Sequence, residues 1–161
     1  MEYDRFGRLA WTVDALGRRT SFGYDGLDRL VRVTDALENS FVLSYDAVGN
    51  LSSFLEPGLV TPTQYAYDDV NRLQTITYPD GSTEGFTYRD NGDLHTYKDT
   101  ADRTFTFEYD NADRLWKIVY PDSSEVVFTY GASGYTTTRT ERNGDLVSYT
   151  RDDLYRVTRD V

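Results

Sequence analysis

Residues 3–9 read YDRFGRL, and closely similar stretches return along the chain: YDGLDRL at 24–30, YDAVGNL at 45–51, YDDVNRL at 67–73 and YDNADRL at 109–115. The first position of the stretch, called position 0 below, falls at residues 3, 24, 45, 67, 88, 109, 130 and 151. It is tyrosine everywhere except at Arg151, and the spacing is 21 residues apart from one inserted residue before Tyr67. Such regular recurrence predicts an array of similar structural units.

The chemistry of the recurring positions predicts a β-hairpin in each unit. Aromatic or aliphatic residues stand at −2 and 0 and alternate with polar ones, which is typical of a strand with one buried face. Aspartate at +1 can bond the backbone two residues further on and begin a turn. The first seven units carry Gly, Asn or Asp at +4, and these residue types tolerate the positive φ that closes a short hairpin. Leucine at +6 then begins the return strand.

We predict that these positions form a structural repeat motif. Its members are Tyr3, Asp4, Gly7, Leu9, Tyr24, Asp25, Leu30, Tyr45, Asp46, Gly49, Leu51, Tyr67, Asp68, Leu73, Tyr88, Gly92, Leu94, Tyr109, Asp110, Leu115, Tyr130 and Gly134. A second turn recurs near +11 to +14, as in Pro79-Asp80-Gly81, so each unit holds two strands of about six residues. No stretch has a helical period. The expected fold is all-β: antiparallel β-hairpin repeats of about 21 residues that form a curved ribbon.

Two features of the pattern leave alternatives open. Leucine at +6 is followed by apolar residues at +9, such as Val33 and Ile76, although +6 and +9 face opposite sides of an unbroken strand. Either a bulge intervenes or both faces are partly covered, and the first unit departs further with Trp11 and Val13. Glycine also alternates with Asp or Asn at +4, which is either chance or a two-hairpin superperiod of about 42 residues.

Charge and composition argue against several classes of partner. The 161 residues carry a net charge of −10, so nucleic acid and anionic membranes would be repelled. The chain has no cysteine, and no stretch approaches the roughly 18 apolar residues of a membrane span. Neither a signal peptide nor membrane insertion is expected. We predict a single repeat array over residues 1–161, with about seven and a half units, incomplete at both ends, as in a fragment or a module that something else completes.

No group of residues predicts catalysis. His95, the single histidine, has no recognisable nucleophile partner, and turn chemistry explains the recurring aspartates. The pattern matches neither the EF-hand loop nor the nonapeptide calcium repeat, so no metal and no cofactor are expected. Arginine at +5, as in Arg8 and Arg29, either binds a sugar or carboxylate or pairs with a neighbouring acid across the sheet. The tyrosine rows either stack on carbohydrate or build the core.

The units YDRFGRL, YDGLDRL, YDAVGNL, YDDVNRL and YDNADRL resemble the YD repeat of RHS proteins over essentially the whole chain. That family includes bacterial polymorphic toxins, toxin-complex C subunits, wall-associated proteins and teneurins. The resemblance implies a segment of a hollow β-shell, which in the bacterial toxins encloses a C-terminal toxin until delivery. It also implies a secreted or cell-surface location as part of a larger bacterial protein. The chain departs from the family in having neither the DPxG-type core-terminating segment nor a non-repeat C-terminal domain.

The expected function is therefore structural rather than enzymatic: a shell segment that encloses and helps deliver a toxin or effector domain. The alternative is a cell-surface module that binds carbohydrate or protein. Expected partners are the remaining repeats of a larger shell, or copies of the chain that associate through exposed strand edges. An enclosed toxin domain and carbohydrate are further candidates.

Overall fold

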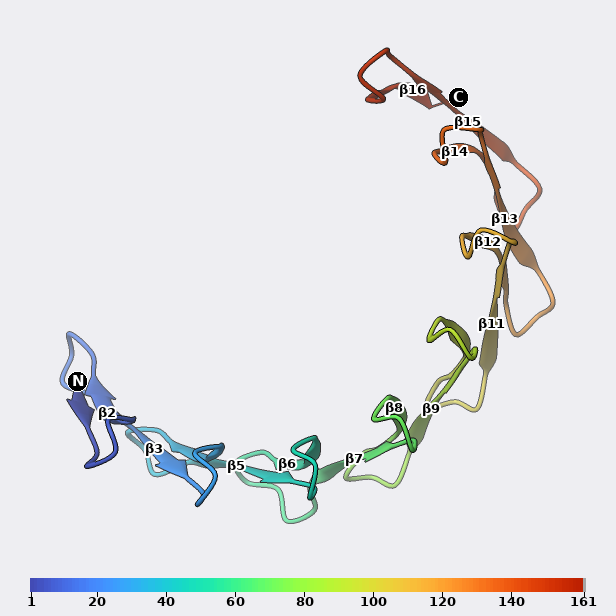
Figure 1. Ribbon diagram of the computed structural model, residues 1–161. Helices are drawn as coiled ribbons and strands as arrows, with labels where there is room; N and C mark the ends of the chain where they lie inside the picture. Colours follow the sequence, from blue (N-terminus) through green and yellow to red (C-terminus); the bar gives the residue numbers. More distant parts are fainter. Residues whose placement is uncertain (161) are drawn as a thin grey trace. The chain divides into compact units, whose positions relative to one another are not determined.

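The computed structural model of the protein describes residues 1–160, and all regular secondary structure among them is β-strand (Figure 1). The chain divides into two compact units, Met1–Thr83 and the residues from Glu84 onward. The strands of the first unit are β1 (Glu2–Tyr3), β2 (Leu9–Val13), β3 (Arg19–Tyr24), β4 (Leu30–Thr34), β5 (Ser40–Tyr45), β6 (Leu51–Leu55), β7 (Thr63–Tyr67) and β8 (Leu73–Thr77). The second unit contains β9 (Thr83–Tyr88), apart from its first residue, and then β10 (Leu94–Lys98), β11 (Thr104–Tyr109), β12 (Leu115–Val119), β13 (Glu125–Tyr130), β14 (Thr136–Thr140), β15 (Leu146–Arg151) and β16 (Val157–Asp160).

Within each unit the strands follow one another in sequence order and pair antiparallel. The YD hairpins of the structure are β1–β2, β3–β4, β5–β6, β7–β8, β9–β10, β11–β12, β13–β14 and β15–β16, numbered 1 to 8 below. The prediction of an all-β fold of antiparallel hairpin repeats is confirmed. The curvature of the ribbon and the continuity of one array over residues 1–161 stay predictions.

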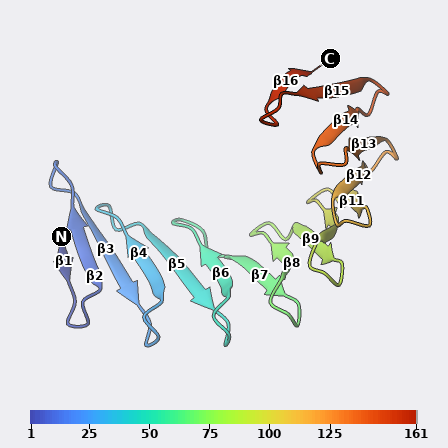
Figure 2. The same ribbon diagram turned by 45° about the horizontal axis from the view of Figure 1, so that its top comes forward.

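The turns of successive hairpins lie on two opposite edges of each sheet (Figure 2). These are the two borders of the sheet formed by the strand ends, not its outermost strands. We call the border that carries positions +1 to +5 the YD edge, and the border that carries the second turns the far edge. We call the place where one hairpin pairs with the next a joint, as between β4 and β5. The predicted motif residues therefore recur at one edge, a single hairpin apart.

A β-bulge in each hairpin settles the question of positions +6 and +9. In hairpin 2, Tyr24 is paired with Leu30 and Phe22 with Val33, so the return strand carries one extra residue, Val31. The same register shift occurs in all eight hairpins. Because directly paired residues share a face, the bulge places positions −2, 0, +6 and +9 on one side of the sheet. The alternative of an intervening bulge is confirmed.

The face formed by these positions, called the tyrosine face below, is only half-buried. Rings touch along it from strand to strand, as in Phe86–Tyr97–Phe105, with centroids 5.4 and 5.7 Å apart. Among the described residues Val126, which is 6% exposed, is the single buried apolar residue. The tyrosines thus contact their neighbours within one layer of sheet, and the described part of the chain has no closed core beneath them.

Candidate functional site

Each YD corner, the turn at positions +1 to +5, is organised by one carboxylate. In hairpin 2 the Asp25 Oδ1 accepts hydrogen bonds from the backbone N–H groups of Leu27 (2.9 Å) and Arg29 (3.0 Å), while Oδ2 accepts one from the Arg29 Nε (2.8 Å). The same three bonds form around Asp4, Asp68, Asp110 and Asp152. The prediction that aspartate at +1 bonds the backbone two residues on is confirmed.

Position +4 has the positive φ that its residue types predicted. The residues concerned are Gly7, Asp28, Gly49, Asn71, Gly92, Asp113 and Gly134. The eighth corner was not predicted, because its +4 residue is a tyrosine: Tyr155 has φ 63°. This conformation is strained for a bulky residue, so a neighbouring contact must stabilise it.

Every described joint within a unit contains a hydrogen bond from position 0 to the preceding hairpin. The Tyr45 hydroxyl donates to the Leu30 carbonyl at 2.8 Å. Pairing between β4 and β5 starts only at Arg32, beyond the bulge, so this carbonyl lies outside the ladder of that joint. Equivalent bonds join Tyr24 to Leu9, Tyr67 to Leu51, Tyr109 to Leu94 and Tyr130 to Leu115. The tyrosine therefore satisfies a backbone group that the bulge leaves without a ladder partner.

Arginine at +5 links its own corner to the next hairpin. The guanidinium of Arg29 lies 4.7 Å from the centroid of the Tyr45 ring, and its Nη1 donates to the Asp46 carbonyl at 3.3 Å. Arg8 over Tyr24 and Arg114 over Tyr130 repeat the ring contact. The expectation that these arginines pair with acids is confirmed. The main partner is the aspartate four residues earlier in the same turn, because a two-stranded corner brings +1 and +5 together. Pairing across the sheet also occurs, between Arg8 and Asp28 of the next hairpin.

Two corners reverse this chemistry without losing the contacts. In hairpin 5 the charges are exchanged: Arg89 stands at +1 and Asp93 at +5, with Nη1 and Oδ2 3.2 Å apart, and the guanidinium still lies over Tyr109. Between hairpins 7 and 8 ring and cation are exchanged, since Arg151 lies over Tyr135. Arg151 also donates to the Thr136 carbonyl at 3.2 Å, in place of the usual tyrosine hydroxyl. The interaction, rather than the residue type, is what recurs.

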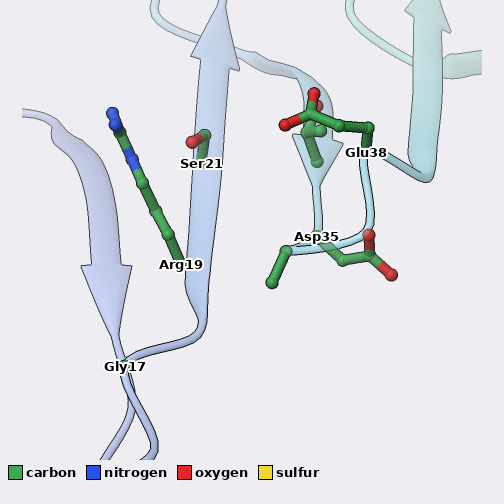
Figure 3. A pocket seen from close by; sticks show the side chains of 7 residues that line it. Gly17, Arg19, Ser21, Asp35 and Glu38 are labelled. Carbon is green, nitrogen blue, oxygen red and sulfur yellow. The ribbon is translucent and has the colours of Figure 1, made fainter.

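Some second turns repeat the carboxylate arrangement of the YD corner: Asp14 and Asp99 each accept two backbone N–H bonds and one bond from the Nε of the arginine four residues on. One hollow, of about 510 Å³, lies on the first unit, where Figure 3 shows Arg19 on β3 and Asp35 and Glu38 on the turn between β4 and β5. The Asp35 carboxylate is already bonded to Asn39 and to backbone N–H groups of its own turn. His95 lines a smaller hollow with Trp116 and Arg89. The described residues contain no cluster of His, Asp or Glu arranged to hold a metal.

Comparison with known proteins identifies the family of this corner-and-joint architecture. The family described as "Teneurin YD-shell" matches residues 1–151. The chain belongs to this YD-shell family. A curated relative, the double-stranded DNA deaminase toxin A of Burkholderia cenocepacia (strain H111), is 36% identical over 84 residues, which are 52% of this chain and 6% of the toxin.

Solved structures share the YD-shell fold at low sequence identity. The crystal structure of TcdB2-TccC3 without its hypervariable C-terminal region superposes on 96% of this chain and 10% of that one, with a TM-score of 0.73 and 16% identity. A Photorhabdus luminescens Tc holotoxin pore superposes on 94% of this chain and 10% of that one, with a TM-score of 0.52 and 14% identity. This chain thus spans a tenth or less of each of these relatives.

The predicted motif residues do not all occupy equivalent places in the YD-shell segment. Tyr3 is 59% exposed, whereas the other tyrosines at position 0 are half-buried. Gly131 replaces the +1 aspartate in hairpin 7. Sequence reasoning missed Tyr135, Arg151 and Tyr155, because none fits the YD pattern, although Arg151 falls in register with it.

The YD-shell corners should lose stability in acid. The pKa of Asp110 lies below its ordinary value of 3.8, chiefly because the Arg114 side chain donates a hydrogen bond to it. A lowered pKa adds stability that is fully present above the unfolded value and is lost as pH falls through the folded one. We expect the free energy of unfolding, measured by urea titration, to fall below pH 3.8.

Asp110→Asn should reduce that acid sensitivity, because the amide has no proton to gain in this range. The matched control is Asp69→Asn, which removes an exposed carboxylate that stands beside Asp68. An unchanged pH dependence in Asp110→Asn would contradict the assignment.

The described residues contain no helix that could serve as a membrane span.

Proposed function

We propose that this chain is a wall segment of a YD-shell that encloses an effector or toxin domain and helps deliver it, with no catalytic role of its own. The observation that carries the proposal is the joint, where position 0 and position +5 both contact the neighbouring hairpin. In the Tyr45 joint the hydroxyl, the ring and the Arg29 guanidinium are all engaged in this way. Side chains that join hairpins in this way support a structural role in a shell wall. Few of their polar groups and ring faces remain available to bind a substrate.

The same engagement disfavours carbohydrate binding by the tyrosine row. A sugar that stacked on Tyr24, Tyr45 or Tyr130 would compete with an arginine for a face of the ring. The family relationship adds support, since the curated relative is a toxin and the similar structures come from Tc toxin complexes. We accordingly propose a secreted or extracellular location for the larger protein.

Exposed apolar residues at the turns of the first unit support the proposal that this chain binds further repeats of a larger shell. Between 63% and 97% of the side chains at these turns is exposed: Phe6, Leu27, Val48 and Val70 on the YD edge, and Leu16, Leu37 and Val60 on the far edge. Scattered single apolar residues need no explanation, but a row at one per hairpin on both edges indicates surfaces that something covers. Further hairpins of the same spacing fit such rows.

The test uses the full natural protein that contains these residues. In limited proteolysis, we expect any domain outside the YD repeats to be cleaved much more slowly than the same domain expressed alone. Tyr45→Ala and Arg29→Ala, introduced together, should accelerate that cleavage because they loosen a joint, whereas Val48→Ala should not. Equal cleavage of the domain inside and outside the full protein would refute enclosure.

A further inference from the structure

Position +4 differs between odd and even hairpins throughout the chain. Odd hairpins have Gly7, Gly49, Gly92 and Gly134, and even hairpins have Asp28, Asn71, Asp113 and Tyr155. All eight residues have positive φ, so the backbone does not require the difference. The +4 residues of the even hairpins must therefore gain something from their side chains, since a non-glycine residue costs roughly 1 kcal/mol in this conformation.

The gain is a contact with the preceding odd hairpin at the YD edge. Four joints contain one, and its chemistry changes from joint to joint while its place does not. The pairs are Arg8 Nη1 with Asp28 Oδ1 at 2.5 Å, Asn50 Nδ2 with Asn71 Oδ1 at 3.0 Å, Arg89 Nη1 with Asp113 Oδ1 at 3.1 Å, and the Tyr135 and Tyr155 rings with centroids 4.9 Å apart. Both members of a pair change together: an ion pair, an amide pair, a second ion pair and an aromatic stack.

Joints from an even to an odd hairpin cannot form this pair, because the +4 residue is glycine. At Gly49 and Gly134 a Cβ would have open space, with no atom within 4 Å. Arg29 and Arg114 still lie over the following tyrosine there, so the common part of the joint is kept. The joint at Gly134 has a contact at the far edge instead, where Arg142 pairs with Asp122 and lies over Tyr120.

We propose that the building unit of this array is a pair of hairpins of about 42 residues, joined at the YD edge by a side-chain pair between the odd corner and the even +4 residue. Glycine at +4 marks the start of each new pair. Adjacent hairpins are therefore coupled more strongly within a pair than between pairs at this edge. The proposal concerns how the array is assembled and holds whether or not the shell encloses a cargo.

The first half of the test removes an existing pair in the full chain and follows thermal unfolding by circular dichroism. Asp28→Gly removes the ion pair and also relieves the backbone cost of a non-glycine residue at +4, so its effect is compared between two backgrounds. It should lower the unfolding midpoint by about 1–4 °C more in the wild-type chain than in an Arg8→Gln chain, where the partner is gone; this is the range for one surface ion pair in a chain of this size. The double-mutant cycle isolates the coupling from the other contacts of Arg8.

The second half builds a pair where the chain has none. Gly49→Asp brings a carboxylate within reach of Arg29, in a conformation that Asp28 already adopts with φ 62°. Gly49→Asp should lower the unfolding midpoint in both backgrounds, but the loss should be a few degrees smaller in the wild type, where Arg29 can pair with the new carboxylate, than in an Arg29→Gln background. Gly49→Ala, the matched control, should lower the midpoint equally in both. Both substituted chains should fold, since nothing lies near the new Cβ. Additive effects in either cycle would overturn the proposal.

Discussion

Tyr45→Ala is expected to lower the free energy of unfolding by about 2–3 kcal/mol, below the range for a fully buried aromatic because the side chain is half-buried. Three contacts disappear together. The ring loses its pairing with Leu51 on the tyrosine face and its contact with the Arg29 guanidinium, 4.7 Å from the centroid. The Leu30 carbonyl loses the hydroxyl that bonds it at 2.8 Å. Urea unfolding followed by circular dichroism measures the sum.

Two variants divide that loss into its parts. Tyr45→Phe keeps the ring and should cost only about 1 kcal/mol, the usual value of one hydrogen bond. Val48→Ala in the same corner changes a side chain that is 71% exposed, and should stay within about 0.5 kcal/mol of the wild type. If Tyr45→Ala proved no more harmful than Val48→Ala, the joint would not be what holds adjacent hairpins together.

The loss should also spread beyond one hairpin, since each described strand of the first unit contacts only the strands next to it in sequence. A repeat array behaves as a chain of nearest-neighbour interactions, so a weakened joint divides it. The position of Tyr45 between hairpins 2 and 3 makes this joint suitable, because β4 and β5 both lie within the first compact unit. Stability here depends on joints rather than on a core, which explains why a segment with so little buried apolar surface can be ordered.

The local features of the fold could be predicted from the sequence because each depends on neighbours in the chain. Asp25 at +1 and Asp28 at +4 define a turn through bonds within five residues, and residue type alone restricts what can stand there. The alternation around Phe22 and Tyr24 likewise predicts a strand with two unlike faces. These features recur in each unit, so one interpretation applied to all of them.

The bulge and the joints depend on pairing between strands, which the pattern left open. Val31 is the extra residue of hairpin 2, yet its type does not distinguish a bulged from a regular strand. The bond from Tyr45 to Leu30 spans 15 residues and requires the bulge to place that carbonyl outside the ladder. The sequence did contain one signal of it: apolar residues at both +6 and +9 cannot share a face without an extra residue.

The reversed corners could not be predicted from a search for conserved letters, because they preserve an interaction while changing both partners. Tyr135 and Arg151 each break the YD pattern alone, but together they keep a cation over a ring. A comparison of positions +5 and 0 across successive units would have found the exchange. Tyr155 is a second example, at +4: it also breaks the pattern by residue type, and its strained conformation is stabilised by stacking on Tyr135.

Arg89→Asp is expected to destabilise the chain by about 1–2 kcal/mol, and adding Asp93→Arg should restore stability to within about 0.5 kcal/mol of the wild type. The single change places a new carboxylate beside Asp93 and Asp113, which now pair with Arg89 at 3.2 and 3.1 Å, and removes the cation from Tyr109. The second change recreates the arrangement of hairpins 1, 2, 4 and 6, with the acid at +1 and the arginine at +5. Urea unfolding of both single variants and the double variant measures the coupling.

Asp93→Arg alone serves as the control, since it should be harmful beside Arg89. Recovery requires that cation and acid can exchange places within one corner while the guanidinium keeps its contact with the next tyrosine. If the decreases in unfolding free energy of the two single variants simply added in the double variant, the two kinds of corner would not be interchangeable.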